Sequence, residues 1–167
     1  MTSFIISLAT QADVPTILKL IHALAEFEQL EQELEVTENS LREGLFGQDA
    51  VARALVARMN GSELVGYAIF YRTFSTFVGR SGIFLDDLYV LPAFRGLGIG
   101  RALLSRVARI GVELGGGRFE WITLRWNENA LRFYRSIGAS VMNEWALLRM
   151  NSNEVHNLIS AKVKVVA

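Results

Sequence analysis

A run of alternating glycines in the middle of the chain, residues 95–100 (Arg-Gly-Leu-Gly-Ile-Gly), constrains the fold more than any other sequence feature. The run follows an apolar, β-branched stretch over about 81–91 and precedes a segment, about 99–114, with apolar residues at helical spacing. We therefore predict a strand, a glycine turn and a helix in succession. Such a turn lets backbone N–H groups converge, and the helix dipole adds positive charge, so the turn suits a pyrophosphate flanked by Arg95 and Arg101.

Other interpretations of this turn stay open at this point. A P-loop ends in Gly-Lys-Ser/Thr, whereas Arg101-Ala102 follows the last glycine here. A dinucleotide-binding turn follows the first strand of a βαβ unit with Gly-x-Gly-x-x-Gly spacing, whereas this run lies past the midpoint of the chain. Glu120, about 20 residues downstream, keeps a nicotinamide cofactor as an alternative. A turn that serves only tight packing is another.

The rest of the chain alternates predicted strands and helices, which we assign to a single domain over residues 1–167. Strands are predicted over 4–8, 52–59, 63–74, 81–91, 119–125 and 145–150, with a further edge strand over 162–166. Helices are predicted over 11–27, between Thr37 and Gly47, over 99–114, and from Asn127 to Ile137. Thr10 and Asp13 have capping-box spacing, and Asn60-Gly61 is typical of a hairpin turn. The order β-α-α-β-β-β-α-β-α-β predicts an α/β (α+β) fold, a mixed sheet with helices on both faces.

Composition argues against several classes of function. Seventeen basic residues balance seventeen acidic ones, so no excess charge favours nucleic acid or a membrane surface. The absence of cysteine excludes disulfides and thiol nucleophiles, and two histidines at unrelated positions, His22 and His156, predict no metal site. No apolar run approaches the roughly 18–20 residues of a membrane span, and the N-terminal pattern is not that of a signal peptide. We expect a soluble, cytoplasmic protein.

Three blocks of sequence together resemble the GNAT N-acetyltransferases. Residues 95–100 match the Arg/Gln-x-x-Gly-x-Gly/Ala acetyl-coenzyme A (acetyl-CoA) signature of that family. Residues 126–130 (Trp-Asn-Glu-Asn-Ala) and 133–139, with Phe133-Tyr134 and Gly138-Ala139, agree as well. Residues 24–28 (Leu-Ala-Glu-Phe-Glu) are similar to the matching stretch of the diamine (spermidine/spermine) and thialysine acetyltransferases. The resemblance extends to about Met150 and implies the GNAT fold, with a mostly antiparallel central sheet.

The resemblance also implies how acetyl-CoA is held. The glycine loop, consisting of Arg95, Gly96, Leu97, Gly98, Ile99, Gly100 and Arg101, is expected to bind the pyrophosphate. On the preceding strand, Leu88, Tyr89 and Val90 are expected to pair with the pantetheine arm through main-chain groups. Asn127 and Ala130 are expected to line the cofactor beside a splayed fifth strand. No metal is implied.

For catalysis, the resemblance implies Tyr134 as the general acid that protonates the departing thiolate, and Asp86 as the base that accepts the amine proton through water. The chemistry agrees, because an amine is cationic at neutral pH and must lose a proton before it attacks a thioester. Taken alone, Tyr134 also fits a core aromatic residue. Asp86 and its neighbour Asp87 leave a regular strand on opposite faces, so we expect at most one in a given pocket unless a bulge intervenes.

The expected substrate contacts are Phe27, Glu28, Asp87, Arg125 and Glu144. Glu28 stands where the diamine-acetylating subgroup contacts its cationic substrate, although it also belongs to an acidic run typical of a solvated surface. Arg125 replaces an acid of the polyamine-acetylating relatives. If its side chain faces the acceptor site, it predicts a preference for amines that carry a carboxylate.

The function predicted from these residues is transfer of the acetyl group of acetyl-CoA to a primary amine of a small molecule, by direct attack in a ternary complex. The amine is a diamine, a polyamine or an amino-acid-like compound. Two alternatives remain: an acetyltransferase for protein or peptide amines, and a non-catalytic acyl-CoA-binding module. We expect a homodimer, because the resembling subgroup forms dimers.

Overall fold

The computed structural model describes residues 3–60 and 63–160, which fall into two compact units, Met1–Leu124 and Arg125–Ala167. The first unit is built on a five-stranded sheet in the order β1-β2-β3-β4-β5. The strands are β1 (Phe4–Leu8), β2 (Arg53–Met59), β3 (Glu63–Ser75), β4 (Arg80–Val90) and β5 (Arg118–Trp121). Neighbouring strands are antiparallel except β4 and β5, which are parallel. The predicted mixed, mostly antiparallel sheet is therefore confirmed, although β5 ends four residues before the predicted end at Arg125.

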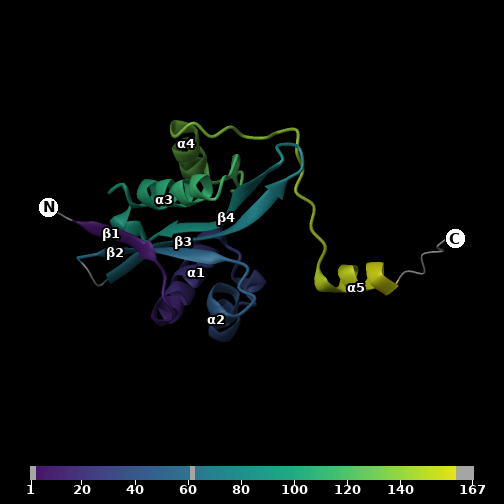
Figure 1. Ribbon diagram of the computed structural model, residues 1–167. Coiled ribbons are helices and arrows are strands. Elements are labelled where there is room, and N and C mark those ends of the chain that lie inside the picture. The colour runs from purple at the N-terminus through teal and green to yellow at the C-terminus, as the bar shows by residue number, and fades with distance from the viewer. Residues whose placement is uncertain (1–2, 61–62, 161–167) are drawn as a thin grey trace. The chain divides into compact units, whose positions relative to one another are not determined.

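Helices cover both faces of this sheet (Figure 1). One face carries α1 (Val14–Glu28) and α2 (Glu38–Phe46), and the other carries α3 (Ile99–Glu113). Short 3-10 turns, η1 (Gln11–Asp13), η2 (Glu31–Glu33) and η3 (Pro92–Phe94), join these elements. The apolar side chains of α1 and α2 form one core with β2, β3 and β4, which includes Val14, Ile17, Leu20, Leu41, Leu45, Val56, Tyr67, Ile69 and Tyr89.

The starts of the first two helices follow from local side-chain chemistry. The Thr10 amide donates to the Asp13 carboxylate at 2.8 Å, and the Ser40 amide donates to Thr37 Oγ1 at 3.1 Å. These bonds satisfy donors that the first turn of a helix leaves without intrahelical acceptors. The predicted helix starts at both sites are confirmed. Asp13 also pairs with Arg58 of β2, which fixes the start of α1 against the sheet.

The second unit contains α4 (Glu128–Ser136) and α5 (Ser152–Ser160). The Asn127 side chain accepts from the Ala130 amide at 3.1 Å, so the predicted cap of α4 is confirmed. The predicted strand over 145–150 is wrong, because this segment is irregular and pairs with no strand in the described ranges. An apolar pattern alone does not make a strand, since its backbone groups need a neighbouring strand as partner. The predicted strand over 162–166 lies outside the described residues.

Within residues 3–60 and 63–160, each helix is too short or too polar to traverse a lipid bilayer.

Candidate active site

Strand β4 separates from β5 part-way along its length. Residues 82–85 pair with β5 on one side and with β3 on the other, whereas residues 87–90 pair only with β3 in the described part of the chain. The Leu91 amide donates to the Val65 carbonyl at 2.9 Å, so by antiparallel alternation the main-chain groups of Leu88 and Val90 face away from β3. The sequence analysis predicts that main-chain groups of Leu88 and Val90 pair with the pantetheine arm. On the β5 side this edge of β4 has no neighbouring strand in the described part of the chain, although the Val90 carbonyl accepts from Arg95.

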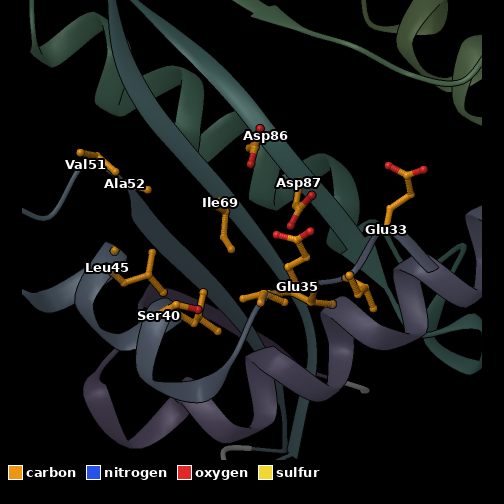
Figure 2. Close-up of a pocket in the computed structure, with 14 residues that line it drawn as sticks. Glu33, Glu35, Ser40, Leu45, Val51, Ala52, Ile69, Asp86 and Asp87 are labelled. Atoms are coloured by element: carbon orange, nitrogen blue, oxygen red, sulfur yellow. The ribbon is translucent and has the colours of Figure 1, made fainter. Parts of the chain in front are cut away.

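A β-bulge lies where this open half of β4 begins. Ile69 of β3 is opposite Asp87 and Phe70 is opposite Leu85, so Asp86 is an extra residue without a counterpart. A bulge re-aims neighbouring side chains, and here Asp86 and Asp87 both line one cavity (Figure 2). The expectation that at most one of them reaches a given pocket was limited to a strand without a bulge. The bulge is the exception that it named, and both aspartates reach the cavity.

The cavity has a volume of about 530 Å³ and lies on the face of the sheet that α1 and α2 cover. Four carboxylates line it: Glu33, Glu35, Asp86 and Asp87. The remaining lining is mostly apolar, and none of the described lining residues is Lys, Arg or His. An anionic, partly apolar cavity of this size suits a small cation.

Asp87 has a perturbed carboxyl group. Burial, together with the negative charges of Asp86 and Glu28, raises its pKa to about 6. A hydrogen bond from the Tyr67 hydroxyl to Asp87 Oδ2, 3.0 Å long, acts in the opposite direction. Asp87 is therefore ionised at neutral pH but is more basic than an ordinary aspartate.

Tyr67 is a site residue that the sequence analysis missed. Its side chain is fully buried within β3, and burial, together with the charge of Asp87, raises the pKa of its hydroxyl well above the usual range. The hydroxyl therefore stays a proton donor at neutral pH. A tyrosine within the otherwise apolar run over residues 64–70 is the signal that was available, because a buried tyrosine hydroxyl usually has a hydrogen-bond partner.

The end of α1 lies close to this acidic cluster. Burial raises the pKa of Glu28, and its charge acts on both Asp87 and Tyr67. The preceding residue, Phe27, packs its ring against the Arg95 guanidinium at 5.0 Å. The structure thus brings the predicted substrate residues Phe27 and Glu28 towards the same side of β4 as Asp87.

Arg95 is engaged differently from its predicted role. Its Nε donates to the Val90 carbonyl at 2.9 Å, and its guanidinium also lies 5.5 Å from the centre of the Tyr89 ring. Arg95 thereby connects the glycine loop to β4 and to the end of α1. These contacts engage Nε and place two aromatic rings against the guanidinium, and a phosphate contact of Arg95 stays a prediction.

The glycine loop has the backbone form that an anion site requires. Gly96 and Gly98 have φ angles of 78° and 82°, which side-chain-bearing residues rarely adopt. A Cβ at either position would meet nothing within 4 Å, so the loop is open and does not serve tight packing. The first bond across the turn runs from the Ala102 amide to the Gly98 carbonyl at 3.0 Å, which leaves the earlier amides of α3 without intrahelical acceptors. The loop fits a pyrophosphate.

Comparison with known proteins decides the family. Residues 18–139 match the model of the acetyltransferase (GNAT) family. This chain belongs to the GNAT acetyltransferase family. Its relatives include a thialysine N-epsilon-acetyltransferase of Sus scrofa, 34% identical over 95% of this chain and 98% of the relative. An L-ornithine N5-acetyltransferase of Arabidopsis thaliana is 30% identical over 89% of this chain and 84% of the relative.

A solved structure supports the same fold. An integron cassette protein from the mobile metagenome of V. cholerae superposes with a TM-score of 0.79, at 23% identity over 95% of this chain and 99% of that chain. The resemblance found in the sequence is thereby confirmed, including its subgroup, and so is the prediction that the chain is an N-acetyltransferase. The nicotinamide and non-catalytic alternatives lose their support.

Five predicted site residues of the acetyltransferase lie in its second unit: Arg125, Asn127, Ala130, Tyr134 and Glu144. Tyr134 is partly buried on α4, with its ring 5.3 Å from that of Phe133, while Arg125 and Glu144 are exposed. The oxygen of Asn127 is used in the cap of α4. The catalytic and binding roles of these residues stay predictions.

Proposed function

We propose that this acetyltransferase transfers an acetyl group from acetyl-CoA to the primary amine of a small molecule that binds in the acidic cavity beside β4. The observation that carries the proposal is the cluster of Asp86 and Asp87 at the bulge, in a cavity with four carboxylates and no basic residue in its described lining. The curated relatives act on thialysine and L-ornithine, by their names, and both compounds carry a primary amine.

The acyl donor is assigned to the open edge of β4 and the glycine loop. Acetyl-CoA supplies the thioester from which the acetyl group is transferred. Gly96 and Gly98 shape a loop with exposed amides for its pyrophosphate, and the outward-facing main-chain groups of Leu88 are available to its pantetheine arm. The open loop and the splayed strand support this assignment.

We assign the general base to Asp87. The acceptor arrives as an ammonium ion, which the carboxylates attract, and it becomes a nucleophile only after it loses a proton. Asp87, whose pKa is about 6, is ionised at neutral pH and binds a proton more readily than an ordinary aspartate does. Asp86, the base expected from the sequence, is more exposed and adds the negative charge that makes Asp87 more basic. Tyr134 remains the proposed general acid for the thiolate.

A cavity of about 530 Å³ has the size of a site for a small molecule, which favours a free amine over a protein N-terminus or lysine. The expected preference for carboxylate-bearing amines depends on Arg125 in the second unit, and the four carboxylates of the cavity oppose it. The homodimer and the cytoplasmic location also stay predictions. Light scattering, compared with the chain mass of 18.6 kDa, tests the homodimer.

The experiment is a spectrophotometric assay of free-thiol release from acetyl-CoA with diamines, polyamines, amino acids, alkylamines and short peptides. We expect release with small primary amines and little with peptides. In Tyr134→Phe we expect kcat to fall by roughly 10²–10⁴-fold at unchanged affinity for acetyl-CoA, because only the proton of the hydroxyl is lost. Binding of acetyl-CoA without thiol release for any amine would overturn the proposed function.

A further inference from the structure

The end of α1 has an unusual residue for the way its backbone finishes. The Gln29 amide donates to the Glu26 carbonyl at 3.2 Å and the Leu30 amide donates to the Ala25 carbonyl at 2.9 Å, which is the pattern of a Schellman motif. Gln29 has a φ of 60°, a conformation that glycine adopts more readily. The local sequence therefore stabilises this end less than a glycine would.

The charges of the same turn are also unfavourable. The last turn of α1, which the structure describes in full, contains no basic residue, whereas Glu26 and Glu28 are both acidic. The C-terminus of a helix carries partial negative charge, so cations stabilise it and anions destabilise it. A cation from another part of the chain would offset this charge.

Arg95 supplies such a cation from the glycine loop. Its guanidinium lies 5.0 Å from the centre of the Phe27 ring on α1 and 5.5 Å from that of the Tyr89 ring on β4. Its Nε donates to the Val90 carbonyl at 2.9 Å, which fixes the guanidinium on β4. Cation–π contacts are favourable, and here they join the last turn of α1 to the strand that carries Asp87.

The turn that Arg95 contacts carries a member of the acidic cluster. Glu28 follows Phe27 directly, and its negative charge raises the pKa of Asp87 and that of the Tyr67 hydroxyl. An ammonium group that approaches Asp87 is therefore attracted by Glu28 as well. A shift of this turn would move Glu28 away from the acceptor, while Asp87 would keep its place on β4.

We propose that Arg95 is a positioning residue for the acceptor: its contacts with Phe27 and Tyr89 hold the last turn of α1 so that Glu28 attracts the amine beside Asp87. This inference rests on the proposed function and specifies how the acceptor site is held together. It adds to the phosphate contact predicted for Arg95, and it couples the glycine loop of the donor to the acceptor side of β4.

The first test compares Arg95→Met with the matched control Arg101→Met, which removes the other arginine of the same loop. The acceptor is the amine with the highest kcat/KM in the thiol-release assay, at saturating acetyl-CoA. We expect Arg95→Met to raise the KM for this amine about fivefold or more, with kcat within about twofold, because attraction is weakened and proton transfer is kept. In Arg101→Met this KM should stay within about twofold of wild type.

A KM that rises equally in both variants, or an effect of Arg95→Met confined to the Kd for acetyl-CoA, overturns the inference. Either result would make Arg95 a donor residue only.

The second test asks whether Arg95 acts through Glu28. Glu28→Gln removes the charge of this side chain and keeps its shape. In a Glu28→Gln chain, Arg95→Met should raise the KM for the amine by less than about twofold further, because the charge that Arg95 positions is already absent. Effects of the two substitutions that multiply in full would contradict the inference.

The third test requires no activity and measures amide hydrogen exchange. Residues 28–30 should exchange about fivefold faster in Arg95→Met than in wild type, since the end of α1 opens more often. Residues 17–20, in the middle of α1, should exchange at the wild-type rate, which shows that the variant is folded. Arg101→Met should change neither segment. Unchanged exchange of residues 28–30 in Arg95→Met would contradict the inference.

The two levels of proposal fail in different ways. Absence of thiol release with every amine refutes the proposed function, whatever the exchange experiment shows. Thiol release by wild type, with an unchanged KM for the amine in Arg95→Met, refutes only the positioning role of Arg95.

Discussion

The two halves of β4 share one strand but have different surroundings. Residues 82–85 lie between β3 and β5, and their side chains include the fully buried Ile83 and Leu85. Residues 86–90 begin with a bulge, carry Asp86 and Asp87, and have β3 as their only neighbouring strand among the residues that the structure describes. The comparison teaches that this half combines two separate features: a main-chain edge that β5 does not cover, and a bulge against β3 that brings two carboxylates to one cavity. We propose these features for the donor and the acceptor, respectively. We expect substitutions in the two halves to have separable effects.

Asp87→Asn, in the open half, should have the largest effect. We expect kcat to fall by roughly 10²–10⁴-fold, since the proton acceptor is lost while its shape is kept. Asp86→Asn is the matched control and should lower kcat much less, because Asp86 acts through its charge. Steady-state kinetics at saturating acetyl-CoA measures both. A larger loss in Asp86→Asn would return the base to the residue predicted from the sequence.

Asp87→Asn should also be more stable than wild type at neutral pH. The folded-state pKa of about 6 exceeds the ordinary value of 3.8, so ionisation of Asp87 opposes folding. This cost is absent below pH 3.8, grows between pH 3.8 and 6, and is complete above pH 6, where it reaches about 3 kcal/mol. Asp87→Asn should therefore raise Tm at pH 7.5 and leave it nearly unchanged at pH 4. A lower Tm at pH 7.5 would contradict this.

Ile83→Ala, in the paired half, should show the opposite pattern. Ile83 has 1% exposure and lies against Gly111 of α3, so its truncation leaves a cavity. We expect the free energy of unfolding to fall by about 2–4 kcal/mol, measured by urea denaturation. At a temperature where the variant is folded, kcat should stay within about twofold of wild type. A large loss of kcat in the folded variant would show that the halves are not separable.

Gly98→Val tests the donor side of the open half. Valine does not readily adopt the φ of 82° at this position, and its side chain would enter the open space above the loop. We expect the Kd for acetyl-CoA to rise by about tenfold or more in a calorimetric titration. Gly115→Val is the matched control, because Gly115 has a φ of 73° and equally open surroundings at the other end of α3. Equal losses of affinity in both variants would mean that backbone strain, and not blockage of the loop, causes the effect.

Tyr67→Phe should have the smallest effect, visible as a change of pH dependence. The Tyr67 hydroxyl stabilises the ionised form of Asp87, so its removal raises the pKa of Asp87. In the pH profile of kcat/KM, the acid limb should then move to higher pH by about half a unit to one unit. Tyr71→Phe, on the same strand, should leave the limb in place. An unshifted limb in Tyr67→Phe would mean that this tyrosine only packs.

The sequence predicted features that depend on local chemistry. The caps at Thr10, Thr37 and Asn127 were found because a capping side chain acts within three residues. The glycine loop was found because its residues are adjacent along the chain. A capping box over Asn151–Glu154, which begins α5, was equally local but was overlooked; the Glu154 amide donates to Asn151 Oδ1 at 3.0 Å.

Features that depend on register between strands could not be predicted. Ile69 and Phe70 are adjacent on β3, but the β4 residues opposite them, at positions 87 and 85, are two positions apart. This mismatch is the bulge, and no local pattern around Asp86 indicates it. The bond from Tyr67 to Asp87 joins residues 20 positions apart. The cavity itself needs α2 to lie beside the start of β2. The strand over 145–150 was predicted wrongly for the same reason, because a strand depends on a partner that its own sequence does not specify.

The position of Gly44 on α2, away from the strand that carries Asp87, has a consequence for substitutions in the cavity wall. The proposed proton acceptor lies at a bulge inside a sheet, where an altered residue disturbs neighbouring strands. Gly44 lines the same cavity from a helix, and a Cβ built there meets nothing within 4 Å. We therefore expect substitutions at Gly44 to alter the cavity wall and leave the sheet unchanged.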